Sequence, residues 1–404
     1  MATFNYTAKD MSGNTINGTF EAASKNEVIG LIREKKYIPV DIREERSGTK
    51  LNKDIDFFEK KVKLRDLALF CRQFATTLRA GITVTDSLDI LKKQSTNKRL
   101  KSVVEVLHED VQKGNALSYA FSKEPKIFPP LLVNMVETGE VSGTLDAVMD
   151  KMADHFEKEF KINQKVKSAI TYPIVVSVVA VAVVVMLLTF VVPTFVQMFA
   201  TFNAQLPLPT KILISISETL KSFWYIYILV IGVAIYLYKK YKETPEGRLR
   251  VDRIKLNMPV FGDLNTKVAM SRFASNLAVM INSGVDIIQA VEIVQKVVGN
   301  DYLKTRLEDV KDGIRKGYGI GMTMEQNGAF PPLVYQMIDV GESSGTLDYV
   351  LDKVSDFYET EVNTAISQLT TIIEPLIIVV LGFVVAFILI SMLLPMFDLY
   401  NIIS

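Results

Sequence analysis

The sequence predicts a mainly α-helical integral membrane protein with two duplicated helical bundles, three transmembrane helices and a small α+β N-terminal module. Residues 128–147 recur at 330–349, with twelve of twenty aligned positions identical. A membrane-length apolar segment follows each copy at the same distance, so the duplicated unit is a polar domain plus a membrane helix. Four prolines keep the same spacing of 202 residues: Pro173 and Pro193 in the first copy, Pro375 and Pro395 in the second.

The overall composition excludes several function classes. A net charge of +1 over 404 residues gives no electrostatic basis for bulk nucleic-acid binding. The single cysteine, Cys71, excludes an internal disulfide and a CxxC metal site. His108 and His155 are too few for a histidine-based metal centre. The polar N-terminus predicts no cleaved signal peptide, and we expect no cofactor.

Residues 1–43 are predicted to form a separate ββαβ module, and the charged stretch 44–62 is predicted to be a linker. Alternation of apolar and polar residues indicates strands, and apolar residues three to four apart indicate a helix. The expected elements are strands at 4–8 and 16–20 about a turn at 12–14, a helix carrying Val28, Leu31 and Ile32, and a strand at 37–42.

Residues 63–168 and 239–374 are predicted to be helical domains of about six helices each. Apolar residues four apart share one helix face in both copies. A glycine follows each set at a position that suits a helix C-terminus. The paired residues are Phe70, Phe74, Leu78 and Gly81 in the first copy, and Phe273, Leu277, Ile281 and Gly284 in the second.

Three apolar segments predict transmembrane helices at 169–197, 223–238 and 375–397. The apolar cores of the first and third are close to the roughly 20 residues that cross a bilayer. The second is shorter, and a buried core helix is its alternative. The remaining segments are an expected external loop at 198–222 and an external tail at 398–404.

The distribution of lysine and arginine predicts the orientation in the membrane. Lys161, Lys165 and Lys167 precede the first span, and a basic cluster from Lys239 to Arg250 follows the second. The positive-inside rule then places the N-terminus and both helical domains in the cytoplasm, and the C-terminus outside. We therefore expect a multi-pass membrane protein with both helical domains in the cytoplasm.

A search for catalytic motifs gives no positive result. The chain has no GxxxxGK[ST] phosphate loop, no HExxH and no GxSxG elbow. Cys71 lies on an apolar helix face, where packing accounts for it better than nucleophilic chemistry. We therefore predict that the chain is not an enzyme.

The strongest polar signal is the repeated turn GEVSGTLD and GESSGTLD, which has three interpretations. Its carboxylates suit a docking surface for a partner, or a site for a hard cation, although the spacing matches no calcium loop. Alternatively it is a capped turn, in which glycine adopts positive φ and Ser142 or Thr144 accepts from free helix N–H groups. The candidate residues are Glu137, Gly139, Glu140, Gly143, Thr144 and Asp146, and Asp339, Gly341, Glu342, Gly345, Thr346 and Asp348.

Glu374 is a second candidate, because it directly precedes the third span where the first copy has Tyr172. An ionisable residue at a membrane boundary can mark function, or it can simply lie in the interface. The paired prolines that flank the first and third spans are interpreted as shared helix-end geometry.

Together these residues resemble the platform family of type IV pilus and type II secretion machines, PilC/GspF. The marks are FPPL with GExSGTLD in both copies, a Phe-rich helix ending in AGI or SGV, LPLPT after the first span, and the leading FNYTAKDMSGNTINGTFEA. The resemblance covers nearly the whole chain. It implies an inner-membrane scaffold, without established catalytic residues, that couples a cytoplasmic hexameric ATPase to movement of pilin or pseudopilin out of the bilayer.

The implied partners are that ATPase, the pilin or pseudopilin membrane helices, other inner-membrane components of the machine and further copies of the chain. A transporter or permease component is the alternative, because transporters also contain internal repeats, although they normally have more spans and polar groups near mid-membrane. A membrane-bound enzyme with an unrecognised site is a third hypothesis. The residues do not distinguish service in a pilus from service in secretion.

Overall fold

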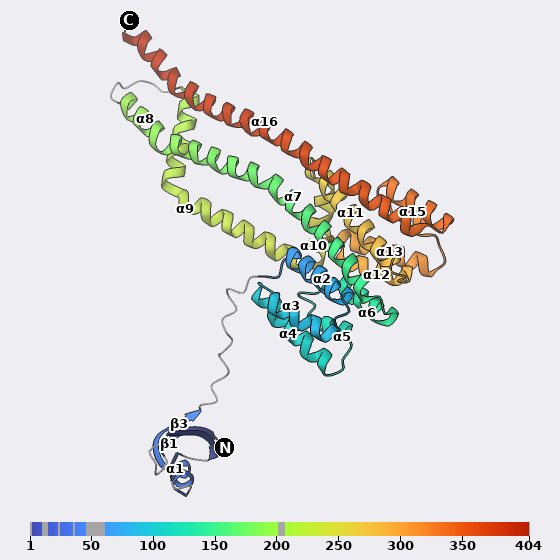
Figure 1. Ribbon diagram of the computed structural model, residues 1–404. Helices are drawn as coiled ribbons and strands as arrows, with labels where there is room; N and C mark the ends of the chain where they lie inside the picture. The colour runs from blue at the N-terminus through green and yellow to red at the C-terminus, as the bar shows by residue number, and fades with distance from the viewer. Residues whose placement is uncertain are drawn as a thin grey trace. The chain divides into compact units, whose positions relative to one another are not determined.

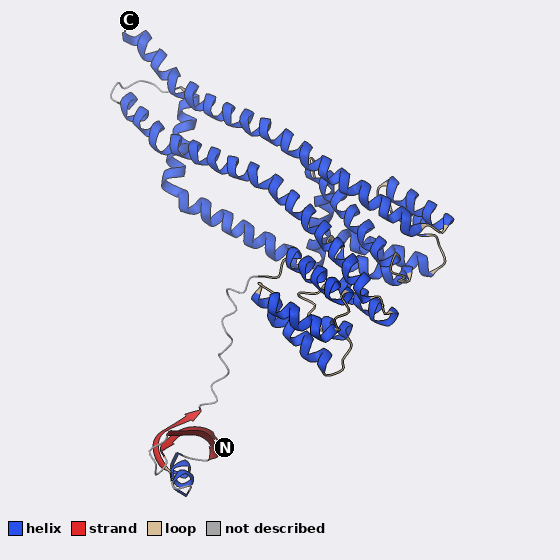
Figure 2. Ribbon diagram, in the orientation of Figure 1, coloured by secondary structure: helices blue, strands red, loops and turns tan. Residues whose placement is uncertain are grey.

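The computed structural model describes residues 2–9, 15–22, 25–34, 37–45, 61–200 and 207–403. The chain divides into two compact units, Met1–Lys61 and Val62–Ser404. Strands occur in the first unit, whereas the described part of the second is built from helices (Figure 2).

The first unit is the ββαβ module that the sequence predicts. Its elements are β1 (Ala2–Lys9), β2 (Thr15–Ala22), α1 (Lys25–Glu34) and β3 (Ile38–Glu45). The strands form one antiparallel sheet in the order β2-β1-β3. Val28 and Ile32 of α1 are buried with Ala8 and Ala22 of the sheet, which gives a small apolar core. The expected turn at 12–14 and residues 46–60 of the expected linker lie outside the described residues.

The second unit contains two bundles of six helices, which confirms the predicted duplication. The first bundle comprises α2 (Leu64–Arg79), α3 (Val84–Gln94), α4 (Lys98–Gln112), α5 (Leu117–Ser122), α6 (Pro130–Ser142) and the first part of α7 (Leu145–Met186). The second comprises α11 (Phe261–Ile281), α12 (Ile287–Val297), α13 (Asp301–Arg315), α14 (Ile320–Asn327), α15 (Pro332–Ser344) and the first part of α16 (Leu347–Ile403). Two further helices, α9 (Leu208–Glu243) and α10 (Pro245–Asn257), connect the copies.

Aromatic side chains form the centre of each bundle. Phe70 lies within 6.0 Å, centroid to centroid, of three other buried phenylalanine rings of the first bundle. In the second bundle Phe273 packs on Phe330 at 5.7 Å. The buried apolar residues of the two bundles form one continuous cluster, so the bundles share a core. This sharing was not predicted from the sequence.

The last helix of each bundle continues from the bundle into an apolar span (Figure 1). Helix α7 passes through a π-helical turn, η1 (Leu187–Val191), into α8 (Val192–Ala200). Helix α16 is continuous to Ile403, so the expected C-terminal tail begins as helix. Together with α9, these helices are the three in the described part of the chain that are long and apolar enough to cross a membrane.

The expectation that the paired prolines mark helix ends is wrong for three of them. Pro173 lies inside α7, and Pro375 and Pro395 lie inside α16. A proline inside a helix removes one backbone hydrogen bond, but in a membrane helix a neighbouring group can satisfy the freed carbonyl. Pro193, by contrast, is the second residue of α8 and lies two residues after the end of the π-helical turn.

The expected loop at 198–222 is also corrected, because the chain is helical from Leu208 onward. Pro207 and Pro209 flank this helix start, where proline is well tolerated. The first half of α9 packs through Leu213 on Leu188 and on Ile388 and Met392 of α16. A kink at Phe223, with φ −120° and ψ 20°, separates this half from the exposed apolar half that follows.

Two hydroxyl groups of the first half of α9 satisfy backbone carbonyls beside the repeated prolines. Thr210 Oγ1 donates to the carbonyl of Ser391, which is four residues before Pro395. Ser217 Oγ donates to the carbonyl of Leu188, which is five residues before Pro193 and therefore in π-helical register with it. These are the carbonyls that lose an N–H partner when proline occupies the later position. Helix α9 thus compensates for both prolines.

Candidate docking surface at the repeated turns

In each repeated turn, one helix ends at a glycine in the left-handed conformation, and the start of the long helix follows. Gly143 has φ 72° and Gly345 has φ 69°, as expected for glycine in a left-handed cap. The N–H of Thr144 donates to the carbonyl of Gly139 at 3.0 Å, and Thr346 donates to Gly341 at 2.9 Å. These bonds belong to the Schellman motif, which closes a helix C-terminus.

Gly139 and Gly341 serve a different purpose, close helix packing. A Cβ added at Gly139 would lie 3.1 Å from Cα of Leu145, and one at Gly341 would lie 3.0 Å from Cα of Leu347. Both contacts are to backbone, which cannot move aside as a flexible side chain can. The small residue therefore lets α6 and α15 approach the first turns of α7 and α16.

The hydroxyl groups of the first turn do not cap the long helix. Thr144 is the N-cap residue of α7 and makes no side-chain cap bond. Ser142 Oγ instead donates to the carbonyl of Thr138, and it lies 2.7 Å from Thr144 Oγ1. The expected cap by either hydroxyl is therefore wrong.

Glu140 and Glu342 cap a different helix in each bundle. Glu140 Oε1 accepts from the N–H of Leu117 at 2.5 Å, and its Oε2 accepts from Ser118 at 2.8 Å. Glu342 Oε2 accepts from the N–H of Ile320 at 2.7 Å, at the position equivalent to Ser118. Each carboxylate thus holds the N-terminus of the short helix, α5 or α14, that precedes the turn helix in the chain. Negative charge at that end also suits the helix dipole.

The other acidic side chains of the turns differ in availability. Asp146 is half-buried and lies 3.7 Å from Nε of Arg79. Glu137, Asp339 and Asp348 are exposed, and none has an ion pair among the described residues. The described chain holds no cluster of three or more His, Cys, Asp or Glu side chains arranged for a metal ion.

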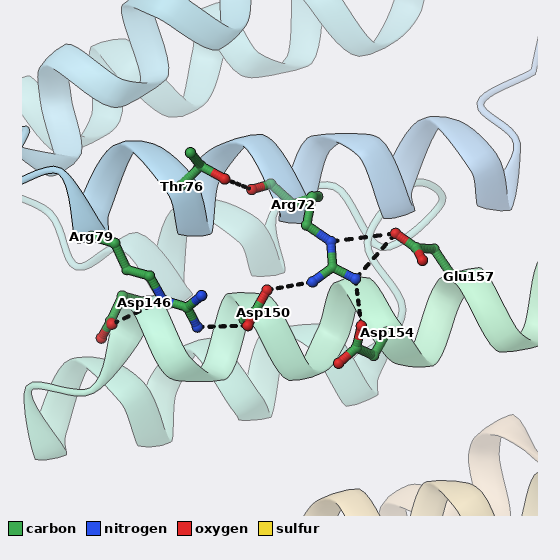
Figure 3. Close-up of polar contacts among 7 residues, drawn as sticks. All are labelled: Arg72, Thr76, Arg79, Asp146, Asp150, Asp154 and Glu157. Carbon is green, nitrogen blue, oxygen red and sulfur yellow. Dashed lines mark hydrogen bonds and ion pairs between the residues drawn. The ribbon is translucent and has the colours of Figure 1, made fainter.

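An arginine network beside the first turn was not predicted from the sequence (Figure 3). Arg72 of α2 pairs with Asp150, Asp154 and Glu157 of α7, the last at 3.1 Å. Arg79, two turns further along α2, pairs with Asp150 at 2.6 Å. The hydrogen bonds from Arg79 and then Arg72 hold the pKa of Asp150 below its usual value. The sequence did contain a signal for this network. Two arginines seven residues apart, and three aspartates four residues apart (Asp146, Asp150 and Asp154), each lie along one helix face.

The second bundle lacks this network. Ser275 and Asn282 occupy the positions equivalent to Arg72 and Arg79, whereas Asp352 and Asp356 retain the acids. Asp352 accepts from Asn282 Nδ2 at 3.0 Å, and Asp356 lies 3.4 Å from Nζ of Lys158 in the first bundle. Asp348, the equivalent of Asp146, consequently has no arginine partner among the described residues.

The junction between the bundles is polar. His155 of α7 is buried, with Nδ1 3.4 Å from Ser275 Oγ of α11. Arg272 Nη2 donates to Asn163 Oδ1 at 2.8 Å and lies 3.4 Å from Glu159. Burial, with Lys158 and Arg272 nearby, lowers the pKa of His155 to about 4. Burial raises the pKa of Glu159.

Glu374 lies beside Tyr172, the residue that the sequence aligned with it. Tyr172 Oη donates to Glu374 Oε1 at 3.3 Å, and both side chains are exposed. On the side of this pair towards the bundles, a cleft of about 770 Å³ lies between α7 and α16. There Lys165 Nζ donates to Asn363 Oδ1 at 2.8 Å. On the other side, within the apolar spans, a cleft of about 410 Å³ lies between the same two helices.

The comparisons with known proteins agree with this architecture. The family described as type II secretion system (T2SS), protein F, matches residues 70–193 and again 273–395, and the N-terminal domain of type II secretion system protein F matches 1–43. Type IV pilus assembly protein PilC of Thermus thermophilus is 39% identical over 100% of both chains. PilC of Myxococcus xanthus is 37% identical over 98% of this chain and 95% of its own length, and type II secretion system protein F of Pseudomonas aeruginosa is 31% identical over 100% of both. The chain therefore belongs to the protein F family, the non-enzymatic membrane platforms of type IV pilus assembly and type II secretion.

Proposed function

We propose that this platform protein couples a cytoplasmic assembly ATPase to the extraction of pilin or pseudopilin from the membrane. The observation that carries the proposal is the continuity of α7 and α16, each of which begins at a repeated turn and ends in an apolar span. A displacement applied at a turn is transmitted along a helix more directly than through a flexible linker.

The exposed acids of the turns are the proposed contacts for the ATPase. Glu137 in the first copy, and Asp339 and Asp348 in the second, have no ion pair among the described residues. Glu140 and Glu342 accept backbone hydrogen bonds from α5 and α14, so we propose that they support the surface rather than contact the partner. The remaining proposed partners are pilin membrane helices at the spans, other components of the machine, and further copies of this chain that would match an ATPase ring.

Charge reversal tests the proposed contact. The triple variant Glu137→Lys, Asp339→Lys, Asp348→Lys should lose crosslinking to the ATPase and surface fibres or secretion, while its membrane level stays normal. Glu325→Lys, at an exposed carboxylate of α14 without an ion pair among the described residues, is the matched control. Normal crosslinking and assembly by the triple variant would contradict docking at the turns.

The proposed orientation places both bundles in the cytoplasm and the 198–206 connection outside. A topology reporter fused near Asn203 should be external, and one near Gly313 cytoplasmic. Reconstitution separates the transporter alternative, because solute flux by the chain without partners would favour a permease over a platform.

A further inference from the structure

We propose that residues 239–262 form a membrane-surface anchor, in which basic side chains bind anionic phospholipid headgroups and the turn after α10 inserts into the interface. The proposal goes beyond the proposed function and is independent of which machine the platform serves. Four observations support it.

The first observation is backbone strain at an exposed position. Val260 has φ 72° and ψ −52° and is the non-glycine residue with positive φ in the described chain. The N–H of Phe261 donates to the carbonyl of Pro259 at 2.9 Å, which closes a γ-turn. A β-branched residue is poorly suited to this region, and glycine would adopt it without strain. Strain at such a residue points to a function for its side chain.

The second observation is the apolar character of this turn. Met258 is 42% exposed, Val260 52% and Phe261 36%, and Ile254 on α10 is 59% exposed. Exposed apolar groups that lie together mark an interaction surface.

The third observation is the level of the turn relative to the membrane. Asn282, the C-cap residue of α11, contacts Asp352 of α16, and Lys267 of α11 contacts Glu361, so the two helices are antiparallel. Leu264 lies in one buried cluster with Leu369. The turn is about 5 Å beyond Leu264, and the apolar span of α16 begins about 9 Å beyond Leu369 at 1.5 Å per residue. The turn therefore lies close to the level at which the span of α16 begins, which is the expected membrane boundary.

The fourth observation is basic charge that directly follows a span. The exposed apolar half of α9 ends at Tyr238. Five exposed basic residues follow it, without ion pairs among the described residues: Lys239, Lys240, Lys242, Arg248 and Arg250. The segment 239–262 holds seven basic residues and three acids. Of these acids, Glu243 and Glu246 are exposed, and Asp252 is buried and pairs with Lys255 at 2.6 Å. Clustered basic residues beside a span favour anionic lipid, and a mixture of basic and apolar groups is typical of a segment that lies in the interface.

A spin label at Val260→Cys in the full chain tests the anchor, because the native Cys71 is buried. Accessibility to oxygen and to a water-soluble nickel chelate is measured in nanodiscs of phosphatidylcholine, with and without phosphatidylglycerol. Anionic lipid should raise oxygen accessibility relative to nickel accessibility at 260. Val141→Cys, at an 88% exposed valine in the repeated turn, is the matched control and should not change.

A charge variant separates lipid binding from simple proximity to the bilayer. Lys239→Gln, Lys240→Gln and Arg250→Gln together should reduce the ratio of inserted to water-exposed label by up to about fivefold for each charge removed. A label at 260 that stays accessible to water in both membranes would overturn the anchor. So would protection that requires an added protein partner, since that result would assign the surface to a protein.

Discussion

At the residue scale, Glu140 and Glu342 belong to a polar motif that suggested a docking surface, but in the structure their carboxylates cap other helices of the same chain. Their carboxylates accept backbone N–H groups of helices that lie more than twenty residues earlier. A carboxylate–amide bond is charge-assisted and therefore stronger than a neutral one. The sequence places glutamate beside the turn glycine, but it does not reveal which distant helix end lies within reach.

The first prediction concerns this cap. Glu140→Ala should lower the free energy of unfolding by about 1–3 kcal/mol, because two backbone donors lose a charged acceptor. The loss is measured as a lower thermal midpoint in detergent. Glu137→Ala, an exposed acid of the same helix, is the control and should shift the midpoint little. Equal midpoints for the two variants would show that the cap contributes no stability.

The second prediction is a pH dependence from His155. Its pKa is lowered from 6.5 to about 4 in the folded chain, so the unfolded chain binds a proton more readily over that window. Stability that depends on neutral His155 is present above about pH 6.5 and is lost as the pH falls towards 4. His155→Gln should therefore show a flatter decrease of thermal midpoint between pH 6.5 and 4.5 than the unsubstituted chain.

The titration of Glu159 changes stability with pH in the opposite direction to that of His155. The effect of His155 must therefore be obtained as the difference between two pH profiles. Its pKa is raised, and its contribution is lost as the pH rises above its ordinary value of 4.5. Subtracting the profile of His155→Gln from that of the unsubstituted chain isolates the histidine. The groups that face the pair are Lys158 on α7, Arg272 on α11 and Glu359 on α16. Parallel profiles would rule out a titrating role for His155.

At the element scale, α9 is the part that sequence reasoning describes least well. The apolar composition of Phe223–Tyr238 predicts its span, whereas the polar residues that interrupt Leu208–Ser222 favour a loop that the structure replaces with helix. Two of those polar residues stabilise the fold by donating hydrogen bonds to backbone carbonyls of neighbouring helices. Thr210 and Ser217 face the carbonyls beside Pro395 and Pro193.

The third prediction tests this compensation. Ser217→Ala should lower stability by about 1–3 kcal/mol, because the Leu188 carbonyl is left without a partner in a buried site. Thr219→Ala is the control, since that hydroxyl bonds within its own helix. Adding Pro193→Ala should restore much of the loss, because an N–H returns at 193 to meet the carbonyl. Additive losses in the double variant would contradict the proposed pairing of hydroxyl and proline.

At the whole-molecule scale, much of the architecture could be predicted because duplication and hydrophobicity are local in the sequence. The twelve identities between 128–147 and 330–349 gave the two bundles, and apolar runs gave the spans. The shared core and the pairing of Arg72 with carboxylates of α7 could not be predicted, since both depend on which faces meet after folding. The continuity of α7 through Pro173 was not predicted either, because proline commonly breaks or kinks a helix.

The fourth prediction concerns the difference between the two copies. Arg72→Gln should lower the free energy of unfolding by about 1 kcal/mol, because three partly exposed carboxylates of α7 lose their common partner. Their mutual repulsion should then make the variant more stable in high salt than in low salt. Lys92→Gln, whose nearest acids lie 3.6 Å away, is the control. A loss no larger than that of Lys92→Gln would show that the arginine does not fasten α2 to α7.

The shared core has a consequence for biosynthesis. The first bundle leaves the ribosome before residues 261–404, which supply the other part of its apolar cluster. Two spans must enter the membrane in that interval, while the face of the first bundle that meets α11 and α12 stays uncovered. A nascent chain halted after Glu243 should accordingly be bound by chaperones or digested at this face, and become protected only when the second bundle has been translated.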